Sequence, residues 1–315
     1  MRGYDPPECT WQQRVLSAPS PPVTPESLNL SFPIWPVGAL LGSLISLSIG
    51  TSFAKSLFPA VGAGGTTLYR LVFATLMLMA FWRPWRRRWT WADALPLGLY
   101  GVTLGVMNLL FYSAIKTIPF GLAIAIEFTG PLAVALWHSR RASDLVWVVL
   151  AMLGLGMILP MPGAHDALNP LGIGFALAAG ACWAMYIVFG QRVAQRYGTM
   201  ATPMGMLAAA LVVTPFGLYE AGSALLDTQW LAAGLAVALL SSAVPYTLEM
   251  YALKHLPKNT FSILLSLEPA VGAVAGWIVL GERLSPGQWA AMGFIITASM
   301  GSAWSAGRRG AKPSQ

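Results

Sequence analysis

The chain has 315 residues, of which 56% are hydrophobic and only 10% are charged, and its mean hydropathy is +0.62. A soluble domain is ordinarily about 25% charged, so a soluble globular fold is excluded and most of the chain must be surrounded by lipid. The net charge of +7 comes from short basic clusters between apolar runs, which fits orientation in a membrane better than nucleic-acid binding.

The N-terminal segment, residues 1–33, is polar and rich in proline, and it lacks the apolar stretch of a signal peptide. We predict a disordered cytoplasmic tail here and assign it no function. A second, basic cytoplasmic tail is predicted at residues 306–315.

Ten apolar stretches follow, each long enough to cross a bilayer as a helix. They cover residues 36–58, 62–82, 92–113, 119–138, 143–161, 170–192, 200–220, 229–253, 258–280 and 285–305. The turns between the third, fourth and fifth stretches are short, which leaves their boundaries the least well defined.

The distribution of lysine and arginine predicts the orientation. If the N-terminus is cytoplasmic, the outer connections hold only Lys55, Lys116 and Arg283, and Arg70 lies inside a span. All other basic residues fall on the inner side, as the positive-inside rule requires. We therefore predict an all-α integral membrane protein with ten transmembrane helices and both termini in the cytoplasm.

One sequence pattern occurs twice, 138 residues apart and without gaps. Ala-Ile-Lys-Thr-Ile-Pro at 114–119 is matched by Ala-Leu-Lys-His-Leu-Pro at 252–257. A second proline follows twelve residues later in each copy, at Pro131 and Pro269, with Glu127 near the first and Glu268 beside the second. The pattern indicates an internal duplication.

The duplication divides the ten spans into two repeats, at residues 36–161 and 170–305. A repeat of five helices must enter the membrane in opposite senses in its two copies. Inverted-topology repeats are typical of secondary transporters, because the two halves can exchange roles as a central site alternates in access.

Four ionisable residues lie within the predicted spans: Arg70, Glu127, Glu249 and Glu268. A charged residue at mid-bilayer costs about 2.5–3.5 kcal/mol on insertion scales, so these side chains are expected to face the bundle interior. Glu127 and Glu268 are the first candidates for binding a proton or a substrate amine, because each lies near a helix-breaking proline. The alternative is a buried glutamate that only holds helices together.

The other two ionisable residues have different expected roles. Arg70 could hold a substrate carboxylate in a bidentate pair, or it could form a structural salt bridge with one of the three glutamates. Glu249 lies nearer the cytoplasmic end of its span, which favours a gating or structural role.

Uncharged polar and aromatic residues add candidates for the pathway: Asn108, Tyr112, Tyr246 and Trp183. Polar side chains also join transmembrane helices by hydrogen bonds without any site, and that interpretation stays open for the first three. The glycine pairs Gly101–Gly105 and Gly272–Gly276 indicate close helix contacts.

Sequence signatures of enzymes are missing: the chain has no HExxH, Gly-x-Ser-x-Gly, P-loop or Cys-x-x-Cys motif. The three histidines are isolated, so neither a metal site nor a cofactor is expected. The interpretation is a transporter rather than an enzyme, driven by an ion gradient or by the gradient of its substrate.

Motifs along the membrane part resemble those of paired EamA domains in the drug/metabolite transporter superfamily, and within it those of the bacterial threonine and homoserine exporters. The resembling stretches are Ala54–Pro59, Pro119–Ala123, Glu127-Phe-Thr-Gly-Pro-Leu-Ala-Val-Ala-Leu136, Ser139–Arg141, Gly180-Ala-Cys-Trp-Ala184, Leu248–Met250, Glu268-Pro-Ala270 and Leu280-Gly-Glu282. The resemblance covers residues 36–305.

The resemblance implies a multi-pass protein of the bacterial inner membrane that exports threonine, homoserine and related small amino acids by proton antiport. Its partners would be the amino acid, protons and the lipid bilayer, without nucleic acid, and a homodimer is an open alternative to a monomer. Other cargo is known in the superfamily, so an aromatic amino acid, a purine or a cationic drug remains the rival substrate. An intramembrane enzyme, a receptor-like sensor and a channel are weaker alternatives.

Overall fold

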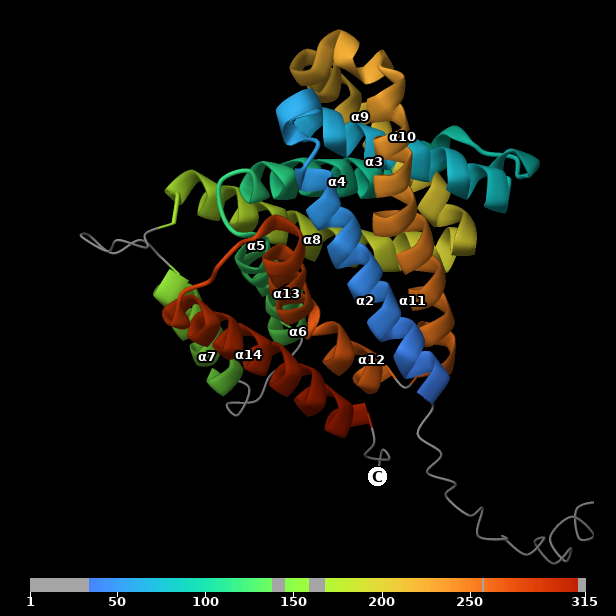
Figure 1. Ribbon diagram of the computed structural model, residues 1–315. Coiled ribbons are helices and arrows are strands. Elements are labelled where there is room, and N and C mark those ends of the chain that lie inside the picture. The colour runs from blue at the N-terminus through green and yellow to red at the C-terminus, as the bar shows by residue number, and fades with distance from the viewer. Residues whose placement is uncertain (1–33, 138–144, 159–167, 257, 311–315) are drawn as a thin grey trace, which may run out of the picture. The chain divides into compact units, whose positions relative to one another are not determined.

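The computed structural model describes residues 34–137, 145–158, 168–256 and 258–310 (Figure 1). The predicted tail 1–33, residues 138–144 with the Ser139–Arg141 motif, residues 159–167, Pro257 and residues 311–315 lie outside the described residues. Every regular element in the described ranges is helical. In chain order the helices are α2 (Ile34–Lys55), α3 (Phe58–Trp82), α4 (Trp91–Ile115), α5 (Phe120–Glu127), α6 (Thr129–Trp137), α7 (Leu145–Ile158), α8 (Pro170–Tyr197), α9 (Ala201–Ala221), α10 (Thr228–Ala238), α11 (Val244–His255), α12 (Lys258–Leu265), α13 (Glu268–Leu280) and α14 (Pro286–Gly310).

The prediction of an all-helical membrane protein is confirmed. Within the described residues, 7 helical segments are long and apolar enough to cross a membrane, and two shorter apolar helices lie at Phe120–Val134 and Leu145–Met157. Where the structure describes them, the predicted stretches overlap single helices or consecutive helices. The last helix, α14, continues to Gly310, beyond the predicted end of its span.

Two of the predicted spans are broken into half-helices. The fourth is divided into α5 and α6 and the ninth into α12 and α13 (Figure 1). Proline has no N–H, so Pro131 leaves the carbonyl of Glu127 without its α-helical donor, and Pro269 does the same to Leu265. These two residues are the last residues of α5 and α12. The prolines therefore account for the position of both breaks.

The helix bounds follow the 138-residue offset of the sequence pattern. Moving Phe120 and Glu127 on by 138 residues gives Lys258 and Leu265, the two ends of α12. The same shift places α2 on α8, α3 on α9, α4 on α10 with α11, and α7 on α14. The two copies of the pattern thus adopt the same local structure.

A different interruption divides the eighth predicted span. A π-helix at Leu239–Ala243 connects α10 to α11. Pro245 removes the α-helical donor for the carbonyl of Ser241 within this segment. Such π-helical turns are rare and frequent at functional sites.

Close helix crossings, made possible by glycine, hold these elements together. On α4, a Cβ added at Gly105 would lie 2.9 Å from the carbonyl oxygen of Ala209 on α9. On α2, a Cβ added at Gly50 would lie 2.7 Å from the amide nitrogen of Ser241 in the π-helix. The expectation that Gly101–Gly105 marks a helix contact is confirmed, and α2 crosses the π-helix without room for a side chain.

Candidate functional site

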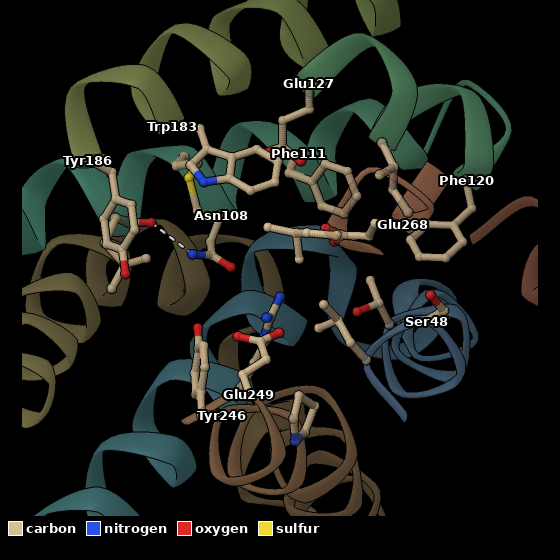
Figure 2. A pocket seen from close by; sticks show the side chains of 18 residues that line it. Ser48, Asn108, Phe111, Phe120, Glu127, Trp183, Tyr186, Tyr246, Glu249 and Glu268 are labelled. Carbon is tan, nitrogen blue, oxygen red and sulfur yellow. Dashed lines mark hydrogen bonds between the residues drawn. The ribbon is translucent and has the colours of Figure 1, made fainter. Parts of the chain in front are cut away.

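One cavity of about 250 Å³ lies where half-helices and interrupted helices from both halves of the chain meet (Figure 2). Its wall comes from α2, α3, α4, α5, α8, α11, α12 and α13. The lining residues are Leu47, Ser48, Thr51, Arg70, Leu104, Met107, Asn108, Phe111, Phe120, Ile124, Glu127, Trp183, Tyr186, Pro245, Tyr246, Glu249, Leu265 and Glu268.

The structure brings together nearly all the residues singled out from the sequence. The four ionisable residues of the spans, Arg70, Glu127, Glu249 and Glu268, all line this cavity. Asn108, Tyr246 and Trp183 line it too. These residues are up to 198 positions apart in the chain, and helix packing alone brings them around one space.

Tyr112 is the exception. It is fully buried, and it is absent from the cavity wall. Its ring lies 5.7 Å from the guanidinium carbon of Arg70, and its hydroxyl accepts a hydrogen bond from Nη1 of Arg70 at 3.5 Å. Tyr112 therefore contacts Arg70 from outside the cavity wall and helps to hold its side chain in place.

Both central carboxylates lie at a helix break. Glu127 is the last residue of α5, and Glu268 is the first residue of α13. Helix N-termini carry partial positive charge, and Glu268 lies in the first turn of α13, where that charge stabilises a carboxylate. In Figure 2 the side chains of Glu127, Glu249 and Glu268 enter the view from different helices around the cavity.

Arg70 is held by the interrupted helix opposite it. Its Nη2 donates to the carbonyl oxygen of Ser241 at 3.1 Å, and its Nε donates to the hydroxyl of Ser242 at 3.3 Å. The Ser241 carbonyl is the group that Pro245 leaves without a helical donor, so the arginine replaces the missing hydrogen bond. The side chain is thereby fixed in the cavity wall.

The alternative role for Arg70, a structural salt bridge, gains no support from the structure. No salt bridge among the described residues joins Arg70 to Glu127, Glu249 or Glu268. A guanidinium has five N–H groups, and the three hydrogen bonds of Arg70 use one on each nitrogen. One N–H on each terminal nitrogen is left for another acceptor.

Glu249 and Asn108 have local partners. Glu249 accepts a hydrogen bond from the hydroxyl of Ser43 on α2 at 3.1 Å. The amide nitrogen of Asn108 donates to the carbonyl oxygen of Leu104, one turn earlier, at 2.8 Å. The amide nitrogen of the Asn108 side chain is thus hydrogen-bonded to its own helix, whereas the side-chain carbonyl oxygen is not.

Several lining residues were missed from the sequence. Ser48 and Thr51 lie on α2, and Phe111 and Phe120 add aromatic surface. A signal for the first two was present: α2 carries five hydroxyl side chains in one apolar helix, at positions 43, 46, 48, 51 and 52. The aromatic residues gave no signal, because their spacing fits packing equally well.

Beyond the cavity, Glu282 joins three elements. One of its oxygens, Oε1, lies 2.5 Å from Nζ of Lys55 at the end of α2. The other, Oε2, accepts a hydrogen bond from the backbone N–H of Phe120 at 2.8 Å and so caps α5. The carboxylate therefore joins the loop after α13 to α2 and α5.

Replacing Glu282 with alanine is expected to lower the free energy of unfolding by about 1–2 kcal/mol, because it removes a helix cap and a partly exposed ion pair. Thermal unfolding in detergent measures the change. Arg283→Ala is the matched control: Arg283 is the exposed neighbour, and its loss should change stability by less than about 0.5 kcal/mol. Equal effects of the two substitutions would contradict the capping role.

Comparison with known proteins identifies the family. Residues 170–304 match the EamA-like transporter family. The chain is 52% identical to the threonine/homoserine exporter RhtA of Escherichia coli (strain K12) over 279 residues, which covers 88% of this chain and 94% of that protein. It is 51% identical to the RhtA of Salmonella typhimurium (strain SL1344) over 271 residues, covering 86% of this chain and 92% of that protein.

A more distant relative and a solved structure agree with this result. The inner membrane transporter YedA of Escherichia coli (strain K12) is 30% identical over 190 residues, covering 58% of this chain and 61% of that protein. A protein of known crystal structure shares the fold, with a TM-score of 0.58 and 19% identity, over 88% of this chain and 99% of that chain. The chain is a multi-pass inner-membrane transporter and belongs to the EamA-like transporter family.

Proposed function

We propose that this protein exports threonine and homoserine across the bacterial inner membrane, in exchange for protons and by alternating access. The observation that carries the proposal is the convergence of Arg70 and three glutamates on one cavity. The exporters named above, which share about half of their residues with this chain over nearly their whole length, support the choice of substrate.

The cavity offers what a small zwitterion requires. The two unused N–H groups of Arg70 can hold an α-carboxylate in a bidentate pair. Glu127 or Glu268 can accept hydrogen bonds from the α-ammonium group. The volume of about 250 Å³ is below the roughly 300–1,000 Å³ of pockets for drug-sized ligands, which favours a small amino acid.

The proposed architecture has ten transmembrane helices, in two inverted repeats at residues 36–161 and 170–305, with both termini in the cytoplasm. The equal bounds of α5 and α12 at the repeat offset support the duplication. In this orientation Lys55 and Lys116 are on the outer side, and each has a carboxylate partner, Glu282 and Glu220. A homodimer stays a prediction.

Proton coupling follows from competition for a carboxylate. With the cavity open to the cytoplasm, a deprotonated glutamate binds the ammonium group of the substrate. After the cavity opens outward, a proton from the periplasm displaces the substrate, and the neutral glutamate returns. Each cycle then moves one amino acid out of the cell. It moves in one proton for each glutamate that changes its protonation state.

Transport in proteoliposomes tests the proposal. Wild-type protein is expected to move labelled threonine and homoserine, faster with an inward proton gradient. Replacing the coupling glutamate with glutamine, at Glu127 or Glu268, should abolish the response to the gradient while threonine-for-threonine exchange continues, because the neutral amide cannot carry a proton. Glu220→Gln, outside the cavity wall, is the control and should keep the response. Folded wild-type protein that moves neither amino acid would overturn the proposal.

A second cargo has one observation in its favour. Phe111, Phe120, Trp183, Tyr186 and Tyr246 make much of the wall aromatic, and aromatic surface suits an aromatic amino acid or a cation. The same assay distinguishes the small amino acids from this second cargo. If the protein carries an aromatic amino acid or a cation, phenylalanine or a quaternary ammonium compound will compete with labelled threonine.

A further inference from the structure

Two hydroxyl groups of α2 belong to the cavity wall but have no role in the proposed binding of the carboxylate and the ammonium group. Ser48 and Thr51 are three positions apart, so they lie on the same face of the helix, and both line the cavity. Their exposed fractions are 1% and 2%. In Figure 2 Ser48 and Tyr186 lie at opposite sides of the view.

Neither hydroxyl has a hydrogen-bond partner. The buried Oγ of Ser48 has none in the described part of the chain, and no hydrogen bond involves the side chain of Thr51 there. Hydroxyls in apolar helices usually donate to the carbonyl one turn earlier, as those of Thr67, Thr75 and Thr103 do at 2.6–2.7 Å. Buried polar groups without partners are uncommon and cost free energy.

We infer that Ser48 and Thr51 form a subsite that binds the side-chain hydroxyl of the substrate. The inference rests on the proposed function, since threonine and homoserine each carry one hydroxyl. With the carboxylate on Arg70 and the ammonium on a glutamate, the side chain is the part of the substrate that remains to be recognised. A hydroxyl both donates and accepts, so it can supply the hydrogen bond that the α2 hydroxyls lack within the protein.

The subsite has a consequence for specificity. A pocket that hydrogen-bonds a hydroxyl rejects the analogue that lacks it, whereas an apolar pocket hardly distinguishes the two. Removing the hydroxyl from either threonine or homoserine gives the same compound, 2-aminobutyrate. Valine replaces the threonine hydroxyl with a methyl group of similar size. These two compounds therefore measure recognition of the hydroxyl alone.

The experiment compares transport of threonine, homoserine, 2-aminobutyrate and valine in proteoliposomes. Wild-type protein should prefer threonine over 2-aminobutyrate by roughly 10-fold in kcat/KM. Ser48→Ala and Thr51→Val should each lower this preference by about 3- to 10-fold, mainly through a higher KM for threonine, with 2-aminobutyrate unaffected.

The matched control is Ser52→Ala. Ser52 is equally buried and also lacks a hydrogen-bond partner, but it is not in the cavity wall. It should leave the preference unchanged. If Ser52→Ala and Ser48→Ala have the same effect, or if the wild type moves 2-aminobutyrate as well as threonine, the subsite is refuted. If the wild type moves neither threonine nor homoserine, the proposed function itself fails and the subsite with it.

Discussion

Replacing Gly130 with alanine is expected to destroy the folded transporter. Gly130 lies in the first turn of α6, and a Cβ there would overlap the carbonyl oxygen of Gly180 on α8 and lie 2.5 Å from its carbonyl carbon. The obstructing atoms are backbone, which cannot move aside as a flexible side chain can. Gly180 is equally confined, because its own Cβ would lie 2.7 Å from the carbonyl oxygen of Glu127.

The expected cost of Gly130→Ala exceeds the roughly 1–3 kcal/mol typical of overpacking, since two helix backbones must separate beside the break at Glu127. Size-exclusion chromatography and thermal unfolding in detergent should show little or no folded protein. Gly174→Ala is the matched control: it lies on α8, and a Cβ there meets nothing within 4 Å. This change should stabilise the helix by up to about 1 kcal/mol. Wild-type stability of Gly130→Ala would contradict the close approach of α6 and α8.

Replacing Arg70 with lysine is expected to lower transport by at least about 100-fold, although the charge is kept. Lysine has one nitrogen in place of the planar fork, so it cannot hold Ser241, Ser242 and a substrate carboxylate together. Each lost hydrogen bond to the charged group is worth roughly 1.5–3 kcal/mol, and two such losses in the bound state give the stated factor.

Initial rates of counterflow measure this effect, on protein whose folding is checked by chromatography. Tyr112→Phe serves as the matched control, because it removes only the long hydrogen bond from Nη1 of Arg70 behind the cavity. That variant should lose less than about 5-fold. Transport within a few-fold of wild type in Arg70→Lys would show that the arginine does not hold the substrate.

Much of the fold followed from the length of the apolar stretches, because a chain that crosses lipid must satisfy its backbone hydrogen bonds within continuous helices. The breaks at Glu127 and near Glu268 could be expected from Pro131 and Pro269. The positive φ of 69° at Gly62, which kinks α3 near its start, could not. Glycine there permits many conformations. The side chain of Glu220, which packs against Gly62 and accepts a hydrogen bond from the N–H of Gly64, favours this one.

The candidate site was partly predictable for a related reason. A charge inside a membrane span must be enclosed, so Arg70, Glu127, Glu249 and Glu268 could be assigned to the interior before their helices were placed. Serine and threonine cost little in such a helix, because they usually donate to its own carbonyls. The sequence therefore could not distinguish Ser48, which lines the cavity, from Ser52, which does not; only the three-dimensional packing separates them.

The position of Glu282 bears on the speed of the transport cycle. Because one carboxylate holds both Lys55 and the first N–H of α5, a movement that separates α5 from the loop after α13 must break both interactions in a single step. Such a step adds to the activation barrier for opening on this side, which is the periplasmic side in the proposed orientation, and leaves the central cavity untouched. Salt in the external medium screens the partly exposed ion pair. Turnover of this transporter should therefore depend on the ionic strength outside the cell even when the substrate affinity inside does not.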